Sequence, residues 1–93
     1  MTLSASTVET SHGPIHVRQT SGTGTAVLMI HGNSSSGEVF RNQMNGPLGD
    51  RYRMLAPDLP GHGLSGNARD PKRSYSMEGY ADAMTEVLGK MGI

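Results

Sequence analysis

Residues 26–37, AVLMIHGNSSSG, decide the fold, because an apolar run stops abruptly at a loop of small polar residues. The continuous apolar run over 26–30 predicts a β-strand buried on both faces, as in a parallel sheet. The sequence then predicts a short helix over 38–44 and a second core strand over 53–56. Strands that alternate with helices in this way indicate an α/β fold with parallel strands.

The segments on either side of this unit extend the pattern. Residues 8–10 and 15–17 alternate in polarity around a turn that contains Gly13, which predicts a β-hairpin in which Gly13 takes a positive φ. Residues 57–73 are rich in Pro and Gly and are expected to form a long loop. A loop of that length inside a compact domain tends to carry function.

The most regular periodicity lies over residues 76–91. Apolar residues recur there at helical spacing, which predicts an amphipathic helix with Ser76 as its N-cap. Its apolar stripe, which includes Met77, Met84 and Met91, is expected to belong to the core. The α/β pattern calls for another strand after this helix.

Composition excludes several classes of function. The 93 residues contain 8 Lys and Arg against 8 Asp and Glu, so the formal net charge is zero. A neutral chain lacks the excess of basic residues that binding to nucleic acids or anionic membranes requires. There is no Cys, the longest apolar run is too short to span a bilayer, and MTLSAS does not resemble a signal peptide. We therefore predict a cytoplasmic segment of one small domain over 1–93, without cofactor or metal and without a nucleic-acid or membrane partner.

Two glycine patterns invite other interpretations. Gly32 and Gly37 have the spacing of a phosphate-binding loop, but Glu38 stands where that motif needs Lys, and a carboxylate repels phosphate. Residues 61–66, GHGLSG, match the letters of the dinucleotide motif. They are followed by neither a helix nor a suitably placed acidic residue. Both interpretations are disfavoured.

The order of the motifs favours a third interpretation. LMIHGNSSSG (28–37), APDLPGHG (56–63) and the amphipathic helix resemble the N-terminal third of an α/β-hydrolase, over about residues 8–93. Together with ETSHG (9–13) and SYSMEGYADAMTEV (74–87), they resemble more closely the α/β-hydrolase type of N-acylhomoserine lactonase. That group opens the lactone ring of quorum-sensing signals without a metal, so the resemblance implies a quorum-quenching hydrolase.

The resemblance also implies a role for the loop. In the family, the residue after His-Gly donates its backbone N–H to the oxyanion hole, and here that residue is Asn33. Gly32 would allow a close turn, and Asn33, Ser34 and Ser35 would contact a small lactone or carboxylic ester substrate. One such donor is worth about 10²–10³-fold in rate.

The other polar residues of the motifs are expected to serve the fold. His31 and His62 are predicted to hold their loops, and Asp58 to accept N–H groups from the glycine loop that follows it. His12 and His16 are predicted to be exposed on the hairpin and uninvolved in chemistry.

The catalytic groups themselves are missing from the sequence. It contains no G-x-S-x-G motif, Ser65 is not in one, and no Cys can replace it. The family's nucleophile, acid and histidine would follow residue 93. We therefore expect a partial α/β-hydrolase fold, inactive alone, with 26–30 as an open apolar edge and the remainder of its own domain as partner. Two alternatives stay open. One is haloalkane dehalogenase chemistry, which His-Gly-Asn resembles although Ser34 replaces the usual Pro; the other is a non-catalytic fragment.

Overall fold

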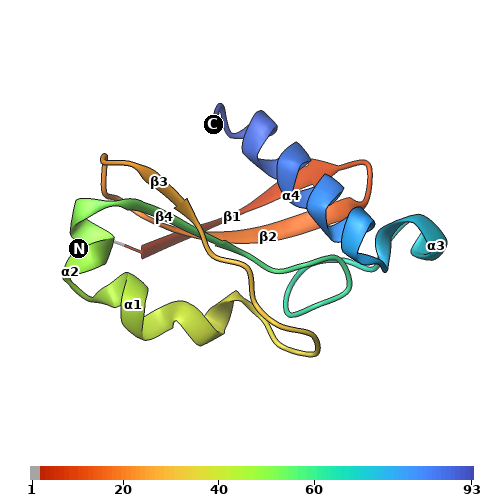
Figure 1. Ribbon diagram of the computed structural model, residues 1–93, viewed down its shortest axis with the longest axis horizontal. Coiled ribbons are helices and arrows are strands. Elements are labelled where there is room, and N and C mark those ends of the chain that lie inside the picture. Colours follow the sequence, from red (N-terminus) through yellow and green to blue (C-terminus); the bar gives the residue numbers. More distant parts are fainter. Residues whose placement is uncertain (1–2) are drawn as a thin grey trace.

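The computed structural model describes residues 3–93, which form a four-stranded mixed sheet with the strand order β1-β2-β4-β3 (Figure 1). Strands β1 (Leu3–Thr10) and β2 (Gly13–Thr20) form an antiparallel hairpin. Strand β4 (Arg53–Pro57) pairs antiparallel with β2 and parallel with β3 (Ala26–Leu28). The predicted parallel pair and the predicted hairpin are therefore both confirmed, and they belong to one sheet.

The hairpin turns where the sequence predicts. Thr10 pairs with Gly13, and Gly13 has a φ of +110°, a conformation that side chains other than hydrogen rarely adopt. Each strand is eight residues long, more than the short alternating runs predict. The additional residues 3–7 of β1 are exposed, and only Leu3 and Ala5 among them are apolar.

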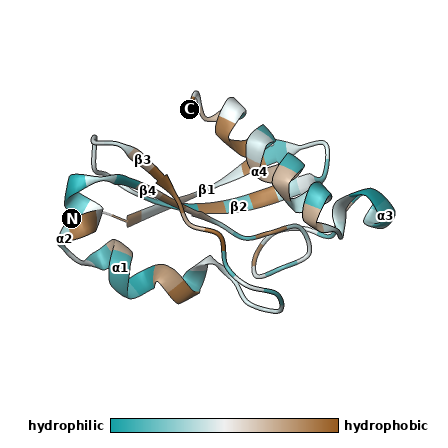
Figure 2. Cartoon of the chain, in the orientation of Figure 1, coloured by the Kyte–Doolittle hydropathy of each residue, from teal (hydrophilic) through white to brown (hydrophobic). Residues whose placement is uncertain are grey.

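Strand β3 lies at the edge of the described sheet, and the prediction that it is buried on both faces is wrong. It ends at Leu28, and Ile30 beyond it is 53% exposed. The cause is that β3 pairs with β4 alone among the strands in residues 3–93, so its outer side has no cover. The predicted open apolar edge is thus present, and Figure 2 shows β3 as a continuously apolar stretch.

The segment between β3 and β4 is more helical than expected. A 3₁₀ turn, η1 (Gly37–Phe40), leads into α1 (Arg41–Asn45), where one short helix was predicted over 38–44. A further helical turn, α2 (Pro47–Arg51), follows before β4, where the sequence predicts no helix. Proline at the first helical position fits this, since the N–H that it lacks has no intrahelical partner at that point.

The last helices are α3 (Pro71–Ser74), a short turn within the predicted loop, and α4 (Met77–Lys90). Ser76 caps α4 as predicted, because its Oγ accepts the N–H of Gly79 at 3.0 Å. The prediction for Met77 is wrong, since its side chain is 79% exposed. Periodicity identifies the apolar face of a helix, but the neighbouring elements decide how much of its length is covered. The buried residues of α4 are Gly79, Ala83, Met84 and Val87.

The core lies on both faces of β4. Leu55 packs with β2 and α4 in one cluster, whereas Met54 and Ala56 pack with Met44 of α1 in another. Side chains alternate between the faces of a strand, so β4 serves both layers. Helix α4 covers one face of the sheet and the η1–α2 segment covers the other (Figure 1). None of the helices within residues 3–93 has the length and apolar character that a membrane span requires.

Candidate active-site loop

The loop over 31–37 joins β3 to η1 and is built on one tight turn. The N–H of Ser35 donates to the carbonyl of Gly32 at 3.3 Å, and Ser34 has a φ of +62°. A positive φ at the third residue of such a turn is typical of type II, in which the N–H of the second residue takes no part in closing the turn. That second residue is Asn33.

The main-chain amide of Asn33 is free within the part of the chain that the structure describes. Among residues 3–93 its N–H has no hydrogen-bond acceptor, and the residue is exposed. Asn33 and Gly32 line a cavity of about 360 Å³. Its other walls come mainly from apolar residues of the loop after β4 and of α4. The apolar walls include Ile30, Leu59, Met77 and Met84. The loop therefore presents a bare hydrogen-bond donor at the edge of an apolar hollow.

The loop residues do not all take the roles that the sequence predicts for them. The left-handed residue of the turn is Ser34, whereas Gly32 has no positive φ, so the role in closing the turn falls to Ser34. A Cβ added to Gly32 would meet no described atom within 4 Å. Ser34 is exposed and Ser35 half-buried, and neither lines the cavity. Only Gly32 and Asn33 of the predicted site residues meet there.

His31 holds the start of the loop, in agreement with its predicted structural role. Its ring is 4% exposed, and Nε2 accepts the N–H of Leu59 at 3.0 Å. Because Nε2 accepts, Nδ1 carries the proton and donates to the carbonyl of Gly32 at 2.7 Å. His62 lies 5.1 Å away, ring to ring, and its Nδ1 donates to the carbonyl of Pro60 at 3.0 Å. Both histidines therefore use ring nitrogen atoms to hydrogen-bond the backbone of the loops around them.

Asp58 holds the end of the same loop. Its buried carboxylate accepts the N–H of Leu64 at 2.9 Å, as predicted for the glycine loop, and also the N–H of Gly37 at 2.7 Å. Arg18 donates to it at 2.8 Å. Burial raises the pKa of Asp58, but the bonds from Leu64, Gly37 and Arg18 outweigh burial and hold that pKa below its ordinary value. Asp58 is therefore an ionised tie between two loops.

Ser65 is a further link in the glycine loop. Its hydroxyl donates to the carbonyl of Asp58 at 2.6 Å and accepts the N–H of His16 at 3.0 Å. His16 is half-buried rather than exposed as predicted, because the glycine loop packs beside its strand. These contacts make Ser65 a structural hydroxyl.

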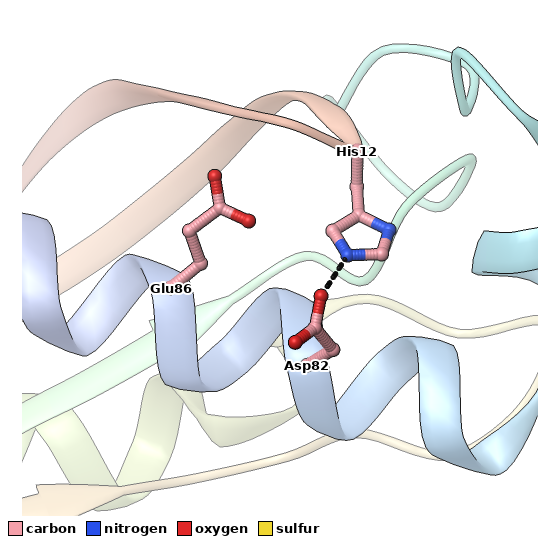
Figure 3. Close-up of side chains that lie close together, drawn as sticks. All are labelled: His12, Asp82 and Glu86. Atoms are coloured by element: carbon pink, nitrogen blue, oxygen red, sulfur yellow. Dashed lines mark hydrogen bonds and ion pairs between the residues drawn. The ribbon is translucent and has the colours of Figure 1, made fainter.

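His12 is the clearest error of the sequence-based prediction. It is fully buried, because the hairpin turn packs against α3 and α4. Its Nδ1 lies 2.6 Å from the Ser74 hydroxyl, and its Nε2 lies 2.7 Å from an Asp82 carboxylate oxygen (Figure 3). The set is Ser-His-Asp in composition, but Ser74 is also fully buried, so its hydroxyl cannot reach a substrate. The hydrogen bond from His12, opposed by some burial, holds the pKa of Asp82 below its ordinary value.

The same corner raises the question of a metal site. His12, Asp82 and Glu86 offer ligand atoms within 4.8 Å of one another (Figure 3). However, Glu86 already accepts the N–H of Ser11 at 2.6 Å and its hydroxyl at 2.8 Å. Arg73 lies 3.0 Å from Asp82 and would repel a cation. Burial raises the pKa of Glu86, but the hydrogen bonds from Ser11 help to outweigh burial, and that pKa lies below its ordinary value. This cluster ties the hairpin to α4 and does not fit a metal ion.

A sequence profile described as the alpha/beta hydrolase fold matches residues 25–93. The chain belongs to the α/β-hydrolase family. This α/β-hydrolase chain is 60% identical to an N-acyl homoserine lactonase, AidH, whose crystal structure was determined with N-hexanoyl homoserine. The two superimpose with a TM-score of 0.97 over 99% of the chain and 34% of AidH. The predicted resemblance and the predicted partial α/β-hydrolase fold are confirmed.

Two further relatives of this α/β-hydrolase show the chemical range of the family. A cis-3-alkyl-4-alkyloxetan-2-one decarboxylase of Xanthomonas campestris is 37% identical over 75% of the chain and 25% of its own length. Haloalkane dehalogenase 2 of Mycobacterium tuberculosis is 33% identical over 91% of the chain and 28% of its own length. The chain thus spans about a third or less of the relatives that it matches.

Two features of the loop escape sequence analysis. The left-handed Ser34 gives no signal, because serine is not a residue that marks positive φ. Arg18 gives only a weak signal, because it is a charged residue on a strand in which Ile15 and Val17 are buried. Both depend on where the loop lies after folding.

Proposed function

We propose that residues 1–93 are the N-terminal segment of a single α/β-hydrolase domain, a cytoplasmic quorum-quenching enzyme that cleaves lactone or carboxylic ester bonds. Its substrates would be N-acyl homoserine lactones. The observation that carries the proposal is the free Asn33 amide at the edge of an apolar cavity. The 60% identity to an N-acyl homoserine lactonase supports this substrate class. So does a relative named for an oxetan-2-one, which is itself a strained cyclic ester.

The chemistry asks little of this segment beyond one well-placed donor. Attack on an ester or lactone carbonyl creates a tetrahedral oxyanion, which a preorganised N–H stabilises better than it stabilises the flat carbonyl. The Asn33 amide would supply that bond, and the absence of a side chain at Gly32 would leave the approach open. The Asn33 amide side chain would contact polar atoms of the substrate.

The remaining parts would come from the rest of the domain. The proposed partner supplies the nucleophile, its acid and base, and the second oxyanion donor, so residues 1–93 alone would be inactive. The apolar surface that would receive it includes the edge of β3, Ile30 at 53% exposure and Met77 at 79% exposure. Exposed apolar residues next to an open strand edge are typical of a surface that another element covers.

The test uses the full-length protein, meaning residues 1–93 together with the rest of the proposed domain. Asn33→Pro removes the amide hydrogen, and proline suits the second position of a type II turn, so the backbone need not move. Asn33→Ala removes the side chain and keeps the amide. We expect the proline variant to lose about 10²–10³-fold in kcat for N-hexanoyl homoserine lactone hydrolysis, well beyond the alanine variant. A proline variant with the kcat of the alanine variant would refute the role of the amide.

A second candidate is dehalogenation, which the 33% identity to haloalkane dehalogenase 2 favours. In that reaction the Asn33 side chain, rather than its main chain, would hold the leaving halide. Halide release from 1-bromobutane by the full-length protein, without lactone hydrolysis, would select this alternative. If neither substrate is turned over, the non-catalytic alternative stands.

A further inference from the structure

We infer that Arg18 is a positioning residue for the Asn33 turn: its guanidinium, through Asp58 and Glu38, fixes the loop that presents the oxyanion donor. The inference rests on the proposed function for its catalytic meaning, but the clamp itself is a property of the described contacts.

The guanidinium of Arg18 joins two parts of the chain beneath the loop. Arg18 lies on β2, opposite Ala56 of β4, and its side chain is 13% exposed. Its Nη1 lies 2.8 Å from Asp58 Oδ1, and its Nε lies 3.2 Å from Glu38 Oε2. Asp58 directly follows β4, and Glu38 belongs to the first turn of η1. One rigid group therefore fixes the end of the central strand against the end of the loop.

The last residue of the loop sits directly on this pair. The N–H of Gly37 donates to the same Asp58 oxygen that Arg18 contacts, at 2.7 Å. A Cβ on Gly37 would lie 2.6 Å from the carbonyl of Ala56 and 3.1 Å from Arg18 Nη1. The backbone at Gly37 is thus in close contact with both the strand and the guanidinium.

Between these supports, the turn is held by the hydrogen bond from His31 Nδ1 to the carbonyl of Gly32, at 2.7 Å, and by its own closing bond. His31 ties the start of the loop to Leu59, and Asp58 ties its end, so both anchors belong to consecutive residues after β4. The turn itself is closed by one hydrogen bond of 3.3 Å, from Ser35. The direction of the Asn33 N–H is consequently set by its two ends, and Arg18 governs one of them.

Arginine suits this place for a chemical reason. The planar guanidinium can meet two carboxylates at fixed angles, whereas the ammonium of lysine is a point charge on a flexible stem. Among residues 3–93, Arg18 is the cation paired with buried Asp58. Replacing it by lysine keeps the charge that Asp58 needs but gives up the fixed geometry.

The experiment compares matched Arg→Lys variants of the full-length protein. Arg18→Lys relaxes the clamp, whereas Arg73→Lys relaxes another bridging arginine, which contacts Asp82 and Ser11 away from the loop. The readouts are kcat and KM for N-hexanoyl homoserine lactone, the affinity for a tetrahedral phosphonate analogue, and hydrogen exchange of amides 32–36.

A donor displaced by about 1 Å can cost on the order of 100-fold in rate. We expect Arg18→Lys to lower kcat by about 10- to 100-fold with KM changed less than about twofold, as for an interaction made only in the transition state. Affinity for the analogue should fall by the same factor, and exchange over 32–36 should become faster. Arg73→Lys should leave all of these readouts unchanged.

A gentler variant guards against loss of folding. Glu38→Gln removes the more exposed arm and leaves the Arg18–Asp58 pair intact, and Arg41→Gln removes the other ion pair of Glu38. Glu38→Gln should act in the same direction as Arg18→Lys, by a smaller factor, and Arg41→Gln should not.

Three results would overturn the inference or separate it from the proposed function. If Arg18→Lys and Arg73→Lys have the same kcat and analogue affinity, Arg18 does not position the donor. If exchange over 32–36 is unchanged in Arg18→Lys, the clamp does not hold the loop. If the wild-type protein hydrolyses neither lactones nor esters, the proposed function fails, and the exchange measurement still decides whether the clamp exists.

Discussion

Replacing Asp58 by asparagine should destabilise the folded protein by a predictable amount. The carboxylate accepts three hydrogen bonds, from Gly37 and Arg18 on one oxygen and from Leu64 on the other. An asparagine of the same shape has one acceptor oxygen, so its NH₂ group must face at least one buried donor. Bonds to charged groups are worth about 1.5–3 kcal/mol, and breaking a buried ion pair from one side costs about 3–5 kcal/mol. Arg18 keeps Glu38 as a partner, so we expect a loss of about 3 kcal/mol at pH 7.

The pH dependence of this loss has a definite sign. The pKa of Asp58 in the folded protein lies below its ordinary value of 3.8, so the folded state binds the proton less tightly than the unfolded state does. The stability that the carboxylate contributes is therefore complete above about pH 4 and is lost as the pH falls through the lowered folded-state pKa. The amide of the substituted asparagine cannot ionise, so the difference between wild type and Asp58→Asn should shrink in that acidic range.

Urea unfolding of the full-length protein, followed by circular dichroism between pH 7 and pH 3, measures both effects. Asp70→Asn is the matched control, because Asp70 is exposed and makes no side-chain capping bond at α3. We expect the control to change the free energy of unfolding by less than about 0.5 kcal/mol. An Asp58→Asn variant as stable as this control at pH 7, or a difference that grows as the pH falls, would refute the reasoning.

Further substitutions test the packing that surrounds the site, each by urea unfolding of the full-length protein. His12→Ala should cost about 2–4 kcal/mol, because it empties a buried site and removes the partner of two polar groups; a loss below about 1 kcal/mol would contradict its structural role. Gly37→Ala should destabilise, since its Cβ would lie 2.6 Å from a β4 carbonyl, whereas Gly89→Ala should stabilise by up to about 1 kcal/mol because its Cβ meets nothing within 4 Å on a helix. Equal effects would contradict the close approach at Gly37. Met84→Ala should cost about 2–4 kcal/mol, because the Met84 side chain is 3% exposed; a loss below about 1 kcal/mol would contradict its place in the core.

The loop over 31–37 depends on contacts that are distant in sequence. Its first residue, His31, is fixed by Leu59, and its last, Gly37, by Asp58, which Arg18 in turn holds from β2. Asp58 and Leu59 directly follow β4, and Arg18 lies on β2. The geometry of the donor is thus a property of the packed layers, and the loop sequence supplies only the small residues that fit there.

The sequence by itself determined the order of the elements and the family. Gly13 and the alternation around it specify the hairpin, Ser76 and a helical period specify α4, and the ordered His-Gly-Asn and PDLPGHG motifs specify the α/β-hydrolase resemblance. These features are local, because the residues that produce each one lie within a few positions of one another. Asp58 was also predictable, since its contact with Leu64 closes a loop only six residues away.

Only the tertiary structure decided burial and the finer geometry of the site. His12 is buried because a turn near the start of the chain meets a carboxylate 70 residues later, and β3 is exposed because of its place in the sheet order. The left-handed Ser34 likewise follows from a loop anchored at both ends, not from the preference of serine. Periodicity shows which side of an element is apolar, but whether anything covers that side depends on residues brought together by folding.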